Sequence, residues 1–242
     1  MASPLMLFTP SAQAQSRRVR YVPPTNLDAP KVSGAGLTRS AGCSESACFI
    51  ALIPELQVEN KPAPLTLSER PTIYFLVPKI NKGRAKFVLR EVNDKSQEQK
   101  EVYKTKFTVQ ENVGVMSFKL PNEAPALKAN QNYIWEVFLT GEDFGEVIRG
   151  SVRRVEPSPK LAQQLKTTMK PLERASFLAQ EGIWFETIQT LIEAKQYAPQ
   201  DLEVKKEWTE ILKSAKLDKV IGQPILACCN LKPYSTLRSN PY

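Results

Sequence analysis

The chain has 242 residues, which allows one large domain or two small ones and is long enough to bury a sizeable core. It carries 33 lysines and arginines against 25 aspartates and glutamates, a formal net charge of +8, and otherwise has the composition of an ordinary soluble globular protein. It contains no histidine, which excludes Ser-His-Asp catalysis, Cys-His catalysis and every histidine-ligated metal site. No run approaches 18 apolar residues, so we expect no transmembrane span.

The first fourteen residues carry no charge and end in a small-residue pattern. Ala12-Gln13-Ala14 fits the cleavage site of a secretory signal, although the apolar run Leu5–Phe8 is short and no basic region precedes it. We interpret residues 1–14 as a truncated signal peptide whose true start lies upstream of Met1. The alternative is a flexible N-terminus without function. On the first interpretation the protein is periplasmic or extracellular.

The four cysteines form two close pairs. In an exported protein, Cys43 and Cys48 can close a small loop through a disulfide. The adjacent Cys228 and Cys229 lack the two-residue gap of common zinc sites, so we expect no metal. The tail at residues 223–242 has no periodicity and is predicted to be disordered.

Residues 15–46 are rich in turn-forming residues and begin with the cluster Arg17, Arg18 and Arg20. We predict an exposed lead-in rather than a domain. A basic arm can bind nucleic acid or anionic lipid, but a solvated arm is the preferred interpretation. Since the chain has no recognisable nucleic-acid motif, we expect no nucleic-acid partner.

From residue 47 to 156 the apolar residues recur with a period of two. In Glu101–Val109, for example, the apolar and threonine side chains share one face and the lysines share the other. Such alternation between turn residues predicts strands at residues 48–53, 72–77, 86–92, 101–109, 113–120, 132–139 and 147–155. About seven short strands in roughly 110 residues predict an antiparallel β-sandwich of immunoglobulin-like size.

Beyond Pro157 the period changes to three and four residues. Predicted helices begin at Pro159, Pro171 and Trp184 and after Asp201, with Ser158 and Asp201 as N-caps. The last of them has Val204, Trp208, Ile211, Leu212 and Ala215 along one face. Short connections predict an antiparallel helical bundle over residues 157–222. The overall fold class is therefore all-β followed by α.

One helical pair has the spacing of a tetratricopeptide hairpin. Ala175, Gly182, Ala194 and Pro199 stand where that hairpin places its small residues and closing proline, although Thr187 replaces an alanine. A single unit is too short for a solenoid, so we expect it to pack on other helices or on the sandwich. A peptide-binding groove is the alternative.

Several stretches, taken in order, resemble a cyanobacterial family known as domain of unknown function 928. They are Gly36–Cys43, Leu52–Pro54, Pro71–Pro78, Tyr133–Trp135, Gly150–Val155 with Leu161 and Leu165, and Gly182–Glu186. The chain departs from the family pattern at Thr140–Asp143, where a cysteine is expected, and at Glu186, where an aspartate is expected. The resemblance implies an exported protein with a β-rich part followed by helices, related to cell-surface and two-partner secretion systems. It implies no activity.

The sequence leaves two functions open. The first is a non-catalytic binding or scaffold module of the cell envelope or of secretion systems, with a protein or cell-surface component as partner. Its candidate interface residues are Arg39, Trp184, Phe185 and Glu186. Because neighbours on a helix cannot both face one way, we expect the Trp184–Phe185 pair to join the helices to the sandwich. Trp135 and Trp208 are expected in the core.

The second function is a carboxylate-dependent hydrolase that acts on envelope polysaccharide. Its candidates are Glu142, Asp143 and Glu146 in a predicted loop, and Glu181 and Glu186 beside the Gly182 turn. A hydrolase would need two carboxylates about 5–10 Å apart in a concave pocket. The chain lacks a calcium loop, a phosphate loop, a Cys-x-x-Cys motif and a nucleophile elbow, so we expect no enzyme, no cofactor and no catalytic residues.

Overall fold

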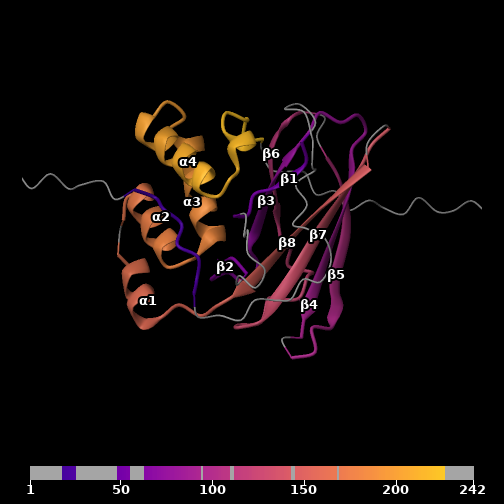
Figure 1. The fold of residues 1–242 in the computed structure, drawn as a ribbon, viewed down its shortest axis with the longest axis horizontal. Helices are drawn as coiled ribbons and strands as arrows, with labels where there is room; N and C mark the ends of the chain where they lie inside the picture. The colour runs from indigo at the N-terminus through magenta and orange to yellow at the C-terminus, as the bar shows by residue number, and fades with distance from the viewer. Residues whose placement is uncertain are drawn as a thin grey trace, which may run out of the picture.

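The computed structural model describes residues 18–25, 48–54, 63–93, 95–109, 112–142, 145–167 and 169–226. Within them the strands precede the helices, as expected (Figure 1). Three strands, β1 (Ile50–Ala51), β3 (Thr72–Val77) and β6 (Gly114–Lys119), form a sheet in the order β1-β3-β6. Five others form a second sheet in the order β2-β8-β7-β4-β5; they are β2 (Leu65–Thr66), β4 (Arg84–Val92), β5 (Gln99–Thr108), β7 (Asn132–Thr140) and β8 (Gly145–Arg154).

The prediction of a single antiparallel sandwich of about seven strands is wrong. The strands divide into two sheets, and β2 pairs in parallel with β8, with Leu65 opposite Arg153, so the larger sheet is mixed. β2 has only two residues, too few to show alternation in the sequence. A period of two identifies the face that a strand buries but not the strand beside which it lies.

The two sheets pack through aromatic side chains on their inner faces. Phe118 of β6 stacks on Phe87 of β4 and Phe107 of β5, with ring centroids 4.3 and 5.3 Å apart. Trp135 of β7 is fully buried beside them and lies opposite Gly150 of β8. The alternation seen in the sequence therefore places every second side chain of β4, β7 and β8 in this core.

Four helices follow the strands: α1 (Pro159–Leu165), α2 (Pro171–Gln180), α3 (Trp184–Tyr197) and α4 (Leu202–Ser214), with a short 3-10 helix, η1, at Asp218–Val220. Ser158 Oγ accepts the Leu161 amide at 3.2 Å, and Asp201 Oδ1 accepts the Glu203 amide at 2.8 Å, so both expected N-caps form. Gly182 ends α2 with a φ of +75°, a backbone conformation that favours glycine. No helix of the described residues is long and apolar enough to cross a membrane.

The prediction of an antiparallel helical bundle is also wrong. α2 and α3 pack as a hairpin, but most of their buried apolar side chains belong to the same hydrophobic core as the two sheets. Ala175, Ile188 and Trp208, from three different helices, all contribute to this shared core. An apolar stripe shows that a helix has a buried face; it does not show whether that face meets a helix or a strand. Figure 1 shows the helices together on one side of the strands.

Residues 18–25 run against the helices. The Val19 amide donates to Glu207 Oε2 of α4 at 2.6 Å, and the Val22 amide donates to the Ala179 carbonyl of α2 at 3.0 Å. Val19 and Tyr21 are buried. The expected exposure of the lead-in is therefore wrong for these two residues, because turn content in a sequence does not reveal which elements a segment packs against.

Candidate functional site

The larger sheet has an outer face opposite the core. Lys86 of β4 lies directly between Lys106 of β5 and Phe138 of β7, and its ammonium is 4.4 Å from the centre of the Phe138 ring. The cationic side chains of this face are Arg84, Lys86, Arg90, Lys104, Lys106, Arg149 and Arg153. Two carboxylates share the face, Glu101 and Glu136. The outer face is therefore predominantly positive.

Glu136 is held between two arginines on this face. Its carboxylate is bound by Arg90 from β4 and by Arg149 from β8, whose Nε donates to Oε1 at 2.8 Å. Burial alone would raise the pKa of the Glu136 carboxyl, but hydrogen bonds from the two arginines outweigh it and lower the pKa below its ordinary value. These ion pairs connect β4, β7 and β8, and the three side chains together carry a net positive charge.

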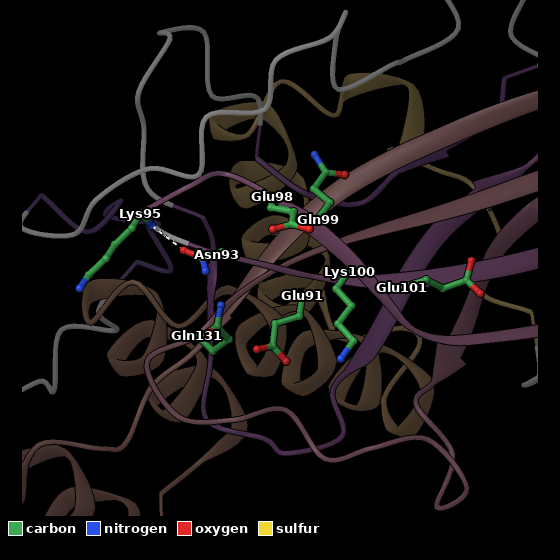
Figure 2. A pocket seen from close by; sticks show the side chains of 8 residues that line it. All are labelled: Glu91, Asn93, Lys95, Glu98, Gln99, Lys100, Glu101 and Gln131. Atoms are coloured by element: carbon green, nitrogen blue, oxygen red, sulfur yellow. Dashed lines mark hydrogen bonds between the residues drawn. The ribbon is translucent and has the colours of Figure 1, made fainter.

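A cleft of about 740 Å³ opens at the free end of the β4–β5 hairpin. The residues that line it, drawn in Figure 2, all have polar or charged side chains: Glu91, Asn93, Lys95, Glu98, Gln99, Lys100, Glu101 and Gln131. The hairpin turn is closed locally, since Asn93 Oδ1 accepts the Lys95 amide at 2.9 Å. Amides, amines and carboxylates of this kind can form hydrogen bonds with hydroxyl groups.

Two of the glutamates in this cleft are already engaged. Both oxygens of Glu91 accept the Lys128 ammonium at 3.0 Å, and this hydrogen bond raises the pKa of the lysine. Glu101 forms an ion pair with Lys104 at 3.0 Å. Figure 2 shows the Glu101 side chain pointing away from Glu91. Both carboxylates are therefore occupied by lysines of the protein itself.

Glu186 lies at a second polar centre, between α3 and the segment that follows β2. Its Oε1 accepts the Thr66 hydroxyl at 2.6 Å and the backbone amides of Leu67 and Ser68, both at 3.1 Å. Oε2 is buried and has no hydrogen-bond partner. Burial raises the pKa of this carboxyl, although the three hydrogen bonds act in the opposite direction. Glu186 thus ties the first turn of α3 to the edge of the larger sheet.

This arrangement predicts how Glu186→Gln changes stability with pH. Because the pKa of Glu186 is higher in the folded than in the unfolded protein, the folded state keeps this proton at pH values where the unfolded state has released it. The contribution of Glu186 to stability is therefore fully present at low pH and is lost as pH rises through the folded pKa. The glutamine keeps the Oε1 acceptor but cannot ionise. Relative to the natural protein, the variant should therefore gain in free energy of unfolding between pH 4 and pH 8.

Urea denaturation of both proteins across that range measures the difference. The unpartnered amide group of the glutamine lowers the free energy of unfolding by the same amount at every pH. Only the change of the difference with pH therefore reports the ionisation of Glu186. A difference that stays constant from pH 4 to pH 8 would contradict the assignment of a raised pKa.

A protein-family model covers most of the chain. The family model described as Domain of Unknown Function (DUF928) matches residues 34–225. The chain belongs to the DUF928 family. The resemblance to this family, expected from the sequence, is thereby confirmed. The comparison with curated proteins finds no match.

The hydrolase candidates of this DUF928 protein lie apart where they are described. Glu142 lies in the turn after β7, and Glu146 is the second residue of β8. Glu142 is exposed and paired with Lys82 at 2.7 Å. Glu186 contacts Thr66, which pairs with Arg154 at the opposite end of β8. Glu181 is exposed at the end of α2, and Asp143 lies outside the described residues.

The aromatic candidates of the DUF928 chain lie inside the fold. Trp184 and Phe185 are both buried, with 0% and 4% of their surfaces exposed. Trp184 Nε1 donates to the Leu52 carbonyl at 2.8 Å, which connects α3 to the chain just after β1. Trp135 and Trp208 are buried as well. None of the three tryptophans can therefore anchor a partner at the surface.

Cys48 is buried and disulfide-bonded. Its partner, like Arg39, lies outside the described residues, so the Cys43–Cys48 pairing stays a prediction. Across the described ranges of the chain, no group of three or more Cys, Asp or Glu side chains could hold a metal ion.

The sequence did not identify Arg90, Glu136 and Arg149 as a cluster. They come from three strands, and only the register of the sheet brings them together. The lysines of β5 did leave a signal, because they alternate with side chains of the same strand that are half-buried or buried.

Proposed function

We propose that this DUF928 protein is a non-catalytic binding or scaffold module that acts outside the cytoplasm, at the cell envelope or in a secretion system. One observation carries the proposal: the larger sheet buries its inner face and leaves an outer face of charged side chains across β4, β5, β7 and β8. A charged surface spread over four strands suits contact with an extended partner better than it suits enclosure of a small substrate.

The rigidity of the fold supports a scaffold role. Helices, sheets and the segment at residues 18–25 share one core, and Trp184 and Glu186 connect α3 to strands far away in the sequence. A surface mounted on such a core is held in a fixed shape, which reduces the entropy lost on binding.

The disulfide at Cys48 supports a location outside the cytoplasm. Disulfides persist in oxidising compartments and are rare where glutathione and thioredoxin keep thiols reduced. Together with the cleavage-like residues Ala12–Ala14, this favours export. Mass spectrometry of the native protein should find an N-terminus after Ala14 and an oxidised Cys48. An intact Met1 together with a reduced Cys48 would contradict export.

The cleft at the β4–β5 hairpin favours the second candidate function, hydrolysis of envelope polysaccharide, because it gathers three glutamates. We rank it lower. Retaining and inverting glycosidases need one protonated carboxyl as acid and a second carboxylate as nucleophile or base. Glu91 and Glu101 already form ion pairs with Lys128 and Lys104, and the Glu101 side chain points away from Glu91.

One experiment separates the two functions. The purified protein and its Glu98→Gln variant are incubated with an isolated cell-envelope fraction, followed by co-sedimentation and by assay of newly formed reducing sugar ends. A binding module should co-sediment saturably, release no sugar ends and be unaffected by the substitution. Release of sugar ends that Glu98→Gln abolishes would establish the hydrolase instead, and failure to sediment would end the binding proposal.

A further inference from the structure

Lys86, Lys104 and Lys106 form a compact group on the outer face of the larger sheet, which we call the lysine patch. Lys86 and Lys106 are directly opposite in the β4–β5 register, and Lys104 is two residues away along β5. Directly opposed side chains in an antiparallel pair have Cβ atoms about 5 Å apart. Residues two apart along a strand are separated by about 7 Å. All three lysines are exposed.

The patch is only partly neutralised by the described part of the protein. Lys104 pairs with Glu101, but no carboxylate of the described residues forms an ion pair with Lys86 or Lys106. Like charges placed directly opposite each other destabilise a sheet. The Lys86–Lys106 juxtaposition is therefore unfavourable to folding unless an external anion is present.

Protection of the sheet edge explains only part of the patch. Lysines on an edge strand prevent edge-to-edge association of sheets, and β5 is such a strand. Lys86, however, belongs to β4, which lies between β5 and β7 and has no free edge. Its ammonium lies over the Phe138 ring of β7, and Lys106 stands opposite Lys86 across the β4–β5 pairing.

The surroundings of the patch distinguish among acidic partners. Single-stranded nucleic acid requires aromatic side chains on which bases can stack. Phe138 is half-buried and lies beneath Lys86. Insertion into a membrane surface requires large apolar side chains around the charges. Among the described exposed large apolar residues, Val147 is the one on this face.

We propose that the lysine patch binds an acidic polysaccharide, a chain with a carboxylate or sulfate on successive sugar rings. The inference rests on the proposed function, because it names the partner chemistry of the same outer face. Charges repeated along a polymer match ammonium groups repeated along and across two strands. Hydroxyl groups of the sugars can also form hydrogen bonds with the polar cleft at the end of the same hairpin.

The test measures binding of the full chain to immobilised polygalacturonate, with neutral dextran, poly(dT) and phosphatidylglycerol vesicles as comparison ligands. Lys106→Glu should weaken binding to polygalacturonate about tenfold and lower its dependence on salt. The same substitution places a carboxylate opposite Lys86, so thermal stability should not fall. Lys160→Glu changes the net charge equally, at an exposed position in the first turn of α1, and should leave binding unchanged.

Three outcomes would overturn the inference: no binding to polygalacturonate, equal weakening by the two substitutions, or tighter binding of poly(dT) or vesicles than of polygalacturonate. If the Lys106→Glu protein still co-sediments fully with the cell envelope, the patch is not the contact surface, while the proposed function stands. If neither protein co-sediments, the proposed function itself fails.

Discussion

Replacing Gly150 with alanine is expected to lower the free energy of unfolding by about 3 kcal/mol. Gly150 lies directly opposite Trp135 in the β7–β8 ladder. A Cβ atom at position 150 would overlap Cζ2 and Cε2 of the indole and lie 2.9 Å from its Nε1. Trp135 has no exposed surface and is enclosed by the aromatic core, so it cannot move aside without displacing its neighbours.

Urea denaturation of the Gly150→Ala protein measures this cost. Gly145→Ala is the matched control, since it lies on the same strand and a Cβ there meets nothing within 4 Å. Its effect should stay within about 0.5 kcal/mol. Combining Gly150→Ala with Trp135→Phe should recover part of the loss, because phenylalanine lacks the overlapping atoms. Equal effects of the two alanine substitutions would show that the indole is not the obstacle.

Glu136→Gln should lower the free energy of unfolding by about 2–3 kcal/mol at neutral pH. The substitution leaves Arg90 and Arg149 beside each other without the carboxylate that both bind. Glu136 is only 4% exposed, whereas the arginines are 26% and 33% exposed and can turn partly towards water, which keeps the effect below that of a fully buried pair.

The effect should depend on pH in a defined direction. The lowered pKa of Glu136 means that its stabilising contribution is present above the ordinary carboxyl pKa and is lost as pH falls through the folded value. The difference in free energy of unfolding between the natural protein and Glu136→Gln should therefore become smaller below pH 4. Glu101→Gln, which breaks the exposed pair with Lys104, is the control and should cost less than about 1 kcal/mol at any pH. A gap that does not change with pH would contradict the ionised state of Glu136.

The sequence predicted individual elements well wherever strong local signals bound them. Residues 72–77 form β3 as expected, because Pro71 and Pro78 limit the strand on both sides. Residues 184–197 form α3, which lies between the positive-φ Gly182 and Pro199. Both signals are local: they act on the backbone of a few residues and do not depend on the rest of the fold.

Which elements contact each other within the fold could not be predicted in the same way. Residues 65–66 become a strand only because β8 offers them a parallel edge, and the helices bury their apolar faces against sheets rather than in a bundle. The Arg90–Glu136–Arg149 cluster joins residues as many as 59 positions apart, and a shift of one residue in register would separate them. The lysines of β5 could be placed on a face from sequence, but Lys86 joins them only through the β4–β5 pairing.

The anchorage of residues 18–25 fixes where the chain enters the folded body. Val19 is bound by α4 and Val22 by α2, on the helical side of the molecule, while β5 lies on the far side of the strands (Figure 1). A linker, lipid or affinity tag attached ahead of Arg18 would therefore hold the protein by its helices. Its β4–β5 hairpin would then project outward, towards whatever surrounds the support.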